Sequence, residues 1–262
     1  MIQKISIVVD SIDRNEGSGA KANIAFIESL AVSGYALTVY HYTRKEIHLP
    51  STICISIPEK KMDVLYALSR IQRILARWTG ININPVIETL FGFSFTYFND
   101  AKSIRKQLQQ IHASDTDLMI TLSQGASFRP HYAVLQLPQL HSKWLAYVHD
   151  PYPFSFYPSP YNWLERGHKQ KEAFFLAVSE KASHSGFPSL MLKEWMGKHF
   201  PGFLSTGVII PHQLGASVDT STVLPDYFRK DAFTILHAGN LMKQRDPSGL
   251  IKGFKLFLTT HP

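Results

Sequence analysis

The sequence has little cysteine and no long hydrophobic run. Cys54 is the only cysteine among 262 residues, which excludes a disulfide scaffold and a cysteine-rich zinc site and suits a reducing compartment. No segment approaches the roughly 20 consecutive apolar residues of a membrane-spanning helix. The opening MIQKISIVVD has an apolar run too short for a signal-peptide core and is typical of a strand. We therefore expect a cytoplasmic protein.

Several chemical classes also lack their motifs. The 12 histidines are scattered without an HxH or HExxH pattern, so we expect no metal site. No GxSxG motif supports a serine nucleophile. The 27 Lys and Arg exceed the 20 Asp and Glu, giving a net charge of +7, which permits partners with phosphate groups. Because these cations cluster on one helix only, we do not expect nucleic-acid binding.

Short apolar runs alternate with segments of helical periodicity along most of the chain. This alternation predicts an α/β fold with a Rossmann-like, doubly wound parallel sheet. The expected strands cover residues 4–9, 36–42, 52–57, 117–122, 144–148, 174–178 and 205–210. The expected helices cover residues 20–33, 61–78, roughly 86–112 and 180–196.

The organisation changes after Pro211. Residues 212–231 are polar and interrupted by Gly215 and Pro225, as is typical of a linker. A new strand is expected at 233–238, followed by a helix that begins at Pro247, a favourable first-turn residue. We predict a complete first domain over 1–211, a linker over 212–232, and over 233–262 the first βα unit of a second Rossmann-like domain.

A glycine-rich loop precedes the first helix. Gly17-Ser18-Gly19-Ala20-Lys21-Ala22 matches GxGxxA, but it lies well after the strand that ends near Val9, and the second strand is followed by no carboxylate for a ribose. A dinucleotide-binding site is therefore disfavoured. Backbone N–H groups at a helix start can still bind an anion or a sugar hydroxyl. A plain βα turn with flexible glycines is the structural alternative.

His149 and Asp150 follow the apolar segment 144–148. The carboxyl ends of strands are where open α/β sheets bind their ligands. An imidazole there can hydrogen-bond a hydroxyl or a phosphate and change charge near neutral pH, and Asp150 could orient it. The Pro151-Tyr152-Pro153 segment would present an aromatic face to a sugar. The alternative is a histidine that caps a strand end above a surface turn.

Two basic segments complete the candidates. The loop 239–247 carries Gly239 and Arg245, where an arginine could clamp a diphosphate, although strand–glycine–loop–helix patterns are common. In KKMDVLYALSRIQRILARW (60–78), the spacing of Arg70, Arg73 and Arg77 forms one basic stripe, with apolar residues largely opposite. Such a helix could lie on an anionic membrane or bind a lipid-linked phosphate. A solvated basic face on a core-packed helix is the alternative.

Taken together, these segments resemble the GT-B glycosyltransferases, in particular retaining family four of bacterial polysaccharide synthesis. The resemblance covers nearly the whole chain. It differs from the family pattern at His212 and Gln213, where Asn and Gly are usual, and at Asn240, where many members have Arg. The matching segments are GSGAKANIAFIESLAVSGYALTVYHY, WLAYVHDPYP, FFLAVSEKASH, VIIPH and HAGNLMKQRDPSGLIKGF.

The resemblance implies metal-independent transfer of a sugar from a nucleotide-sugar to a glycan or lipid-linked acceptor, without a cofactor. The first domain would bind the acceptor and the second the nucleotide. His149, with Asp150, would lie near the reacting sugar. The Gly17–Gly19 loop, Gly239 and Asn240 would lie near the donor, and Arg245 on its pyrophosphate.

The family's Glu-x7-Glu motif would lie beyond residue 262, so this chain alone is expected to be inactive. A peripheral position on the inner face of the membrane is a further expectation. The alternative is a non-catalytic nucleotide- or glycan-binding α/β module.

Overall fold

Seven short segments form one all-parallel sheet in the computed structural model, which describes residues 3–159, 162–214, 228, 231–232, 234–236 and 246–260. The strand order is β3-β2-β1-β4-β5-β6-β7. The chain therefore crosses from β3 to the far side of β1 to form β4, which makes the β1–β4 boundary the topological switch point. The strands are β1 (Lys4–Val9), β2 (Ala36–His41), β3 (Thr52–Ser56), β4 (Leu118–Leu122), β5 (Trp144–Tyr147), β6 (His184–Phe187) and β7 (Gly207–Ile209).

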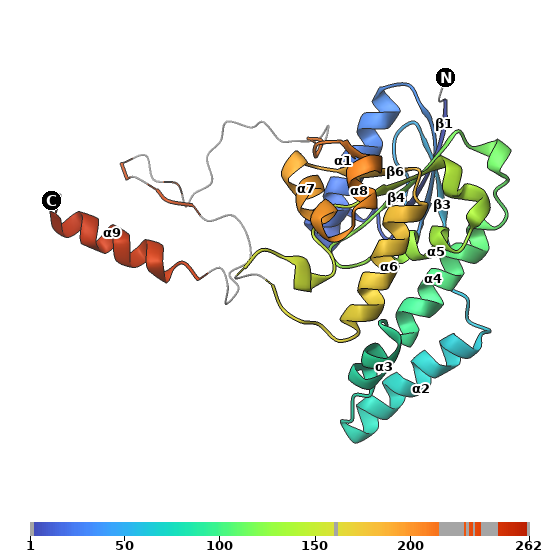
Figure 1. The fold of residues 1–262 in the computed structure, drawn as a ribbon, viewed down its shortest axis with the longest axis horizontal. Coiled ribbons are helices and arrows are strands. Elements are labelled where there is room, and N and C mark those ends of the chain that lie inside the picture. The colour runs from blue at the N-terminus through green and yellow to red at the C-terminus, as the bar shows by residue number, and fades with distance from the viewer. Residues whose placement is uncertain are drawn as a thin grey trace. The chain divides into compact units, whose positions relative to one another are not determined.

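Helices of varied length connect the strands (Figure 1). The α-helices are α1 (Ser18–Val32), α2 (Val64–Thr79), α3 (Asn84–Phe91), α4 (Phe95–Leu108), α5 (Arg129–Leu135), α6 (His168–Lys181), α7 (Leu190–His199), α8 (Gly202–Thr206) and α9 (Ser248–Thr260). Short 3-10 turns are η1 (Arg14–Glu16), η2 (Ala113–Asp115), η3 (Pro138–Lys143) and η4 (Phe154–Phe156). The described helices and strands define a Rossmann-like α/β fold, as the sequence predicts.

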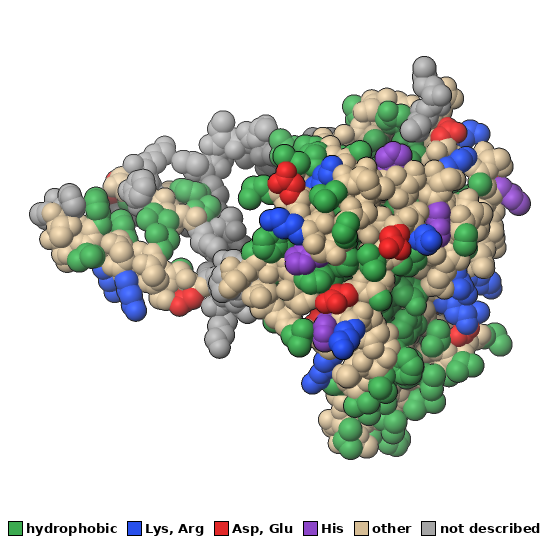
Figure 2. Space-filling view, viewed as in Figure 1, with side chains coloured by type: hydrophobic (Ala, Val, Ile, Leu, Met, Phe, Trp, Pro, Cys, Tyr) green, Lys and Arg blue, Asp and Glu red, His purple; other side chains and the backbone are tan. Residues whose placement is uncertain are grey.

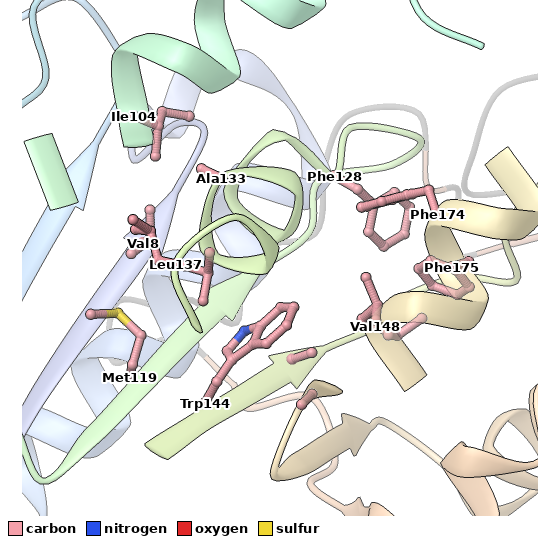
Figure 3. Packing of buried hydrophobic residues seen from close by; sticks show 14 of the residues in the cluster. Val8, Ile104, Met119, Phe128, Ala133, Leu137, Trp144, Val148, Phe174 and Phe175 are labelled. Carbon is pink, nitrogen blue, oxygen red and sulfur yellow. The ribbon is translucent and has the colours of Figure 1, made fainter. Parts of the chain in front are cut away.

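Alternate residues of the strands face two separate hydrophobic layers. Ile5, Ile7 and Val9 of β1 pack with α1 on one side of the sheet. Val8 faces the other side, where α4, α5 and α6 supply the apolar partners. Trp144 lies in this second layer (Figure 3), fully buried, and its indole Nε1 donates a hydrogen bond to Thr121 Oγ1 at 2.8 Å. A buried indole donor needs such an acceptor, so this bond satisfies the one polar atom of the side chain.

The strand predicted over 174–178 is wrong, because these residues lie within α6. The spacing of the buried residues is helical and brings them to one face. The residues that α6 buries are Lys171, Phe174, Phe175, Val178 and Ser179. Leu176, inside the same apolar run, is exposed. A run of five apolar residues is equally compatible with a buried strand and with a buried helix. Only the charged residues on either side of the run distinguish the two.

Two of the predicted helices are also corrected. The segment 180–196 holds the end of α6, the strand β6 and the start of α7. The segment 86–112 holds two helices, because Gly92 ends α3 with a φ of 86° and the Ser94 hydroxyl accepts a hydrogen bond from the Tyr97 N–H at the start of α4. A left-handed glycine after a helix and a serine N-cap before one are ordinary boundary signals.

Contacts divide the chain into two compact units. The first comprises Met1–Tyr157 and Asn162–Val218, and the second comprises Pro158–Tyr161 and Asp219–Pro262. The helix expected from Pro247 is confirmed as α9. Of the strand expected at 233–238, residues 234–236 are not in a strand, and the other residues lie outside the described ranges. None of the helices in the described part of the chain combines the length and apolar character needed to cross a membrane.

Candidate functional site

A pocket of about 230 Å³ lies at the carboxyl edge of the sheet. Its walls come from the start of α1 and from the segments that follow β4, β5 and β7. A larger hollow of about 500 Å³ lies at the amino ends of β1 and β2, but open parallel sheets bind ligands at the opposite edge. The residues that line the smaller pocket are Ser18, Gly19, Ala22, Gly125, His149, Asp150 and His212.

The Gly17–Gly19 loop forms the α1 wall of this pocket. Gly17 is the N-cap of α1 and has a φ of 109°, a backbone conformation that residues other than glycine rarely adopt. Gly19 lies against the loop after β4, where an added Cβ would be 3.0 Å from Gln124 Cγ. No side chain caps the start of α1. The first N–H groups of this helix therefore lie beside the pocket and favour an anion or a hydroxyl oxygen.

Hydrogen bonds fix the position and the tautomer of His149. Its Nε2 lies 2.8 Å from Asn23 Oδ1, while Asn23 Nδ2 donates to the Ser123 carbonyl at 3.2 Å. Since this second bond orients the amide, the oxygen of Asn23 faces the imidazole and accepts, so Nε2 carries the proton. The backbone N–H of His149 also donates a hydrogen bond to Ser123 Oγ at 3.2 Å. Nδ1 is left as the acceptor of the ring.

The surroundings of His149 keep the ring neutral. Burial, and to a smaller extent His212, lower the pKa of His149 to about 3. The His212 ring lies parallel to it, with centroids 5.1 Å apart, and the Tyr147 ring lies at 4.6 Å. The sequence suggested a histidine that changes charge near neutral pH. In the structure it is a neutral group at pH 7, suited to hydrogen bonding with hydroxyls.

A network of charges around two buried carboxylates, Asp10 and Asp100, lies next to the end of β1. Arg129 Nε lies 2.8 Å from Asp10 Oδ1, and Arg129 Nη1 lies 2.7 Å from Asp100 Oδ2. Asp100 Oδ1 accepts from the Tyr42 hydroxyl at 2.9 Å and from Arg44 at 3.1 Å. Burial raises the pKa of Asp10, and the Arg129 charge opposes that shift. The network joins the end of β1 to α4 and α5.

The structure brings together part of the predicted site. Ser18, Gly19, His149 and Asp150 line one pocket, with Gly17 directly before them. The stripe of Arg70, Arg73 and Arg77 lies on α2 and does not line this pocket. The predicted donor residues Gly239, Asn240 and Arg245 lie outside the described residues.

The aromatic face expected from the Pro151–Pro153 segment is not presented to a ligand. Tyr152 is buried, and its ring packs on Phe128 and Phe175, with centroids 4.5 and 5.4 Å away. The prolines flank a core residue here, so the prediction of an exposed aromatic face is wrong.

The sequence did not predict the residues that hydrogen-bond to His149. It assigned orientation of the imidazole to Asp150, whereas in the structure the Asn23 amide and the Ser123 hydroxyl hold the ring and its backbone. Asn23 is fully buried on α1, one residue before buried Ile24. A polar residue on the apolar face of a predicted helix was the available signal, because a buried amide requires partners.

Comparison with models of known protein families gives no match, and comparison with functionally curated proteins gives none either. The described residues hold no group of three or more His, Cys, Asp or Glu side chains that could bind a metal ion. The fold defines the class as Rossmann-like α/β, with a small pocket at the carboxyl edge of its sheet that His149 and Asp150 help to line.

Proposed function

We propose that the chain is part of a GT-B glycosyltransferase, similar to retaining family four, that moves a sugar from a nucleotide-sugar to a glycan or lipid-linked acceptor. The observation that supports this best is the convergence of the Gly17–Gly19 loop with His149 and Asp150 at one pocket. The pocket adjoins the switch point of the sheet, where this architecture binds its ligands.

The chemistry of the lining favours a sugar next to a phosphate. The start of α1 supplies N–H donors and the positive end of a helix dipole. The neutral His149 supplies an acceptor at Nδ1, and Asp150 supplies a carboxylate for hydroxyl groups. Glycosyl transfer requires mainly that the protein stabilise a leaving diphosphate and a cation-like sugar. These groups suit that task better than nucleophilic catalysis.

A second candidate is a non-catalytic nucleotide- or glycan-binding module. The residues that line the described pocket include no Lys or Arg, and a diphosphate is commonly bound by such cations. The glycosyltransferase resemblance assigns this charge to Arg245, which lies outside the described residues. In the alternative, the pocket binds a neutral glycan, and no cation is needed there.

Ligand-observed NMR tests the proposal. Saturation-transfer difference spectra of the full-length protein with UDP-, GDP- and ADP-linked sugars should show contacts to sugar protons for at least one donor. His149→Ala should abolish these signals, because it removes the acceptor and the bond to Asn23. His184→Ala changes an exposed histidine on β6 and should leave the signals unchanged. Equal saturation-transfer signals in His149→Ala and His184→Ala would contradict this site. The absence of signals from the native protein with every donor would also contradict it.

A further inference from the structure

Helices α2 and α3 expose an unusual number of large apolar side chains. Figure 2 shows hydrophobic side chains gathered over this part of the first unit. Trp78 is 83% exposed and Ile71 is 53% exposed. Contiguous apolar patches on soluble proteins are normally small, and larger ones mark sites of interaction. The α2–α3 apolar surface consists of Val64, Leu68, Ile71, Ile74, Leu75, Trp78, Ile81, Val86, Leu90 and Phe91.

The apolar side of α2 does not face the protein core. The buried residues of α2 are Ser69 and Gln72, and the helix packs on α4. Val64, Leu68, Ile71, Leu75 and Trp78 recur at helical spacing on another side. The sequence left open a helix whose apolar side packs into the core. In the structure the basic face is exposed and α2 packs on α4 through another side, which leaves the apolar side exposed.

A basic stripe lies on the side of α2 largely opposite its apolar side chains. Arg70, Arg73 and Arg77 are all exposed, and α2 contains no acidic residue. None of the three forms an ion pair within the described part of the chain; Arg70 lies over the Tyr66 ring at 4.9 Å, and Arg73 Nε donates to the Ser69 carbonyl at 3.1 Å. Their charges are therefore available to an external anionic partner.

Contacts at both ends hold the surface in place. Asp63 caps α2 by accepting from the Leu65 N–H at 3.0 Å, and its carboxylate pairs with Lys60 at 3.0 Å and Lys102 of α4 at 2.6 Å. These contacts lower the pKa of Asp63, with the Lys102 hydrogen bond the largest cause. The apolar side chains at the start of α2 are thus presented by an anchored helix.

The end of α3 is fixed against the start of α6. An added Cβ at Gly167 would lie 2.2 Å from the Glu88 carbonyl oxygen, so the two backbones meet directly. Gln170 Nε2 donates to the carbonyls of Thr89 and Leu90 at 3.2 and 3.0 Å. Such contacts support a fixed presentation of α3.

We propose that the α2–α3 apolar surface docks on an anionic lipid bilayer, with Arg70, Arg73 and Arg77 at the level of the lipid phosphates. An apolar side with a tryptophan, largely opposite a stripe of arginines, is the pattern of helices that lie in the membrane interface. The arrangement fits a bilayer better than a protein partner, because the bilayer supplies both apolar lipid chains and a layer of negative charge over one flat surface. The inference does not rest on the proposed function.

Vesicle co-sedimentation tests the electrostatic part. The chain should bind vesicles of phosphatidylcholine mixed with phosphatidylglycerol and bind pure phosphatidylcholine far more weakly. Replacing Arg70, Arg73 and Arg77 with Gln should weaken binding to the anionic vesicles by roughly 100-fold, at about fivefold per cation near the membrane. The matched control replaces Lys4, Lys181 and Lys198, which are exposed elsewhere, with Gln. This control removes the same charge and should retain most of the binding.

A second variant tests the apolar part. Replacing Ile71, Leu75 and Trp78 with Gln changes exposed side chains, so the far-UV circular dichroism spectrum should stay native while vesicle binding is lost. Light scattering on the native chain without lipid completes the test. A dimer that this triple substitution dissociates, unchanged vesicle binding in the variant, or no vesicle binding by the native chain would each overturn the proposal.

Discussion

His149 is positioned by neutral partners and not by a carboxylate. The Asn23 amide accepts its Nε2 proton at 2.8 Å, and burial lowers the pKa of the ring to about 3. An amide partner orients the ring without stabilising its cation, whereas a carboxylate would do both. This distinction matters for a site that would receive a negatively charged donor, because the imidazole contributes direction and an acceptor rather than charge.

Asn23→Asp should raise the pKa of His149. A carboxylate within hydrogen-bond distance favours the protonated imidazole, so the shift is upward from about 3 toward the ordinary histidine value near 6.5. The measurement is an NMR titration of the His149 Cε1 proton. Asn82→Asp, in an exposed segment, introduces the same charge elsewhere and should leave the titration unchanged. An identical His149 titration in Asn23→Asp and the native chain would refute the assigned contact.

Candidate site residues were predictable where they follow a strand or precede a helix. His149 and the Gly17–Gly19 loop belong to such segments, and parallel topology gathers strand ends at one edge. Asn23, Ser123 and Arg129 were not predicted, because their partners are distant in sequence. The Asn23–His149 contact joins α1 to the end of β5, and no local pattern encodes such a pair.

Among the elements, the β5–β6 pair shows most clearly how packing overrides local preference. The HSGF sequence of β6 has no apolar run, yet it is the strand between β5 and β7. An added Cβ at Gly186 would lie 2.6 Å from Tyr147 Cδ2. The small residue therefore leaves space for the Tyr147 ring, which in turn contacts His149.

Gly186→Ala should destabilise the fold by about 1–3 kcal/mol, the usual cost of an overpacked core. Displacement of the Tyr147 ring should also change the chemical shifts of His149. Urea unfolding measures the first effect and NMR the second. Gly253→Ala in α9 is the control, since an added Cβ there meets nothing within 4 Å. Equal stability of Gly186→Ala and the native chain would show that Tyr147 does not restrict position 186.

The elements that the sequence predicted well have unambiguous local patterns. β1, α1 and β2 follow one another with clear apolar periodicity and a glycine at the end of the helix, Gly34, whose φ is 85°. Two of the errors fall on α6 and β6, where an apolar run lies in a helix and a segment without an apolar run, HSGF, forms a strand. In both places the neighbouring elements, and not the local sequence, decide the structure.

On the scale of the whole molecule, the first unit carries two distinct surfaces. The pocket at the carboxyl edge is small, at about 230 Å³, and its lining includes Ser18, His149, Asp150 and His212. The α2–α3 apolar surface is exposed, and the arginine stripe lies largely opposite it on α2. The net charge of +7 suits both a phosphate-bearing ligand and an anionic membrane.

The most direct test of the central proposal is a transfer assay with the complete gene product. Labelled nucleotide-sugars are incubated with a membrane lipid and glycan extract, and glycosylated products are identified by mass spectrometry. The native protein and His184→Ala should form the same product at similar rates, whereas His149→Ala should be slower by about 100-fold or more, the scale of losing one stabilising contact in the transition state. Donor binding without any transfer, or equal transfer by His149→Ala, would contradict the account.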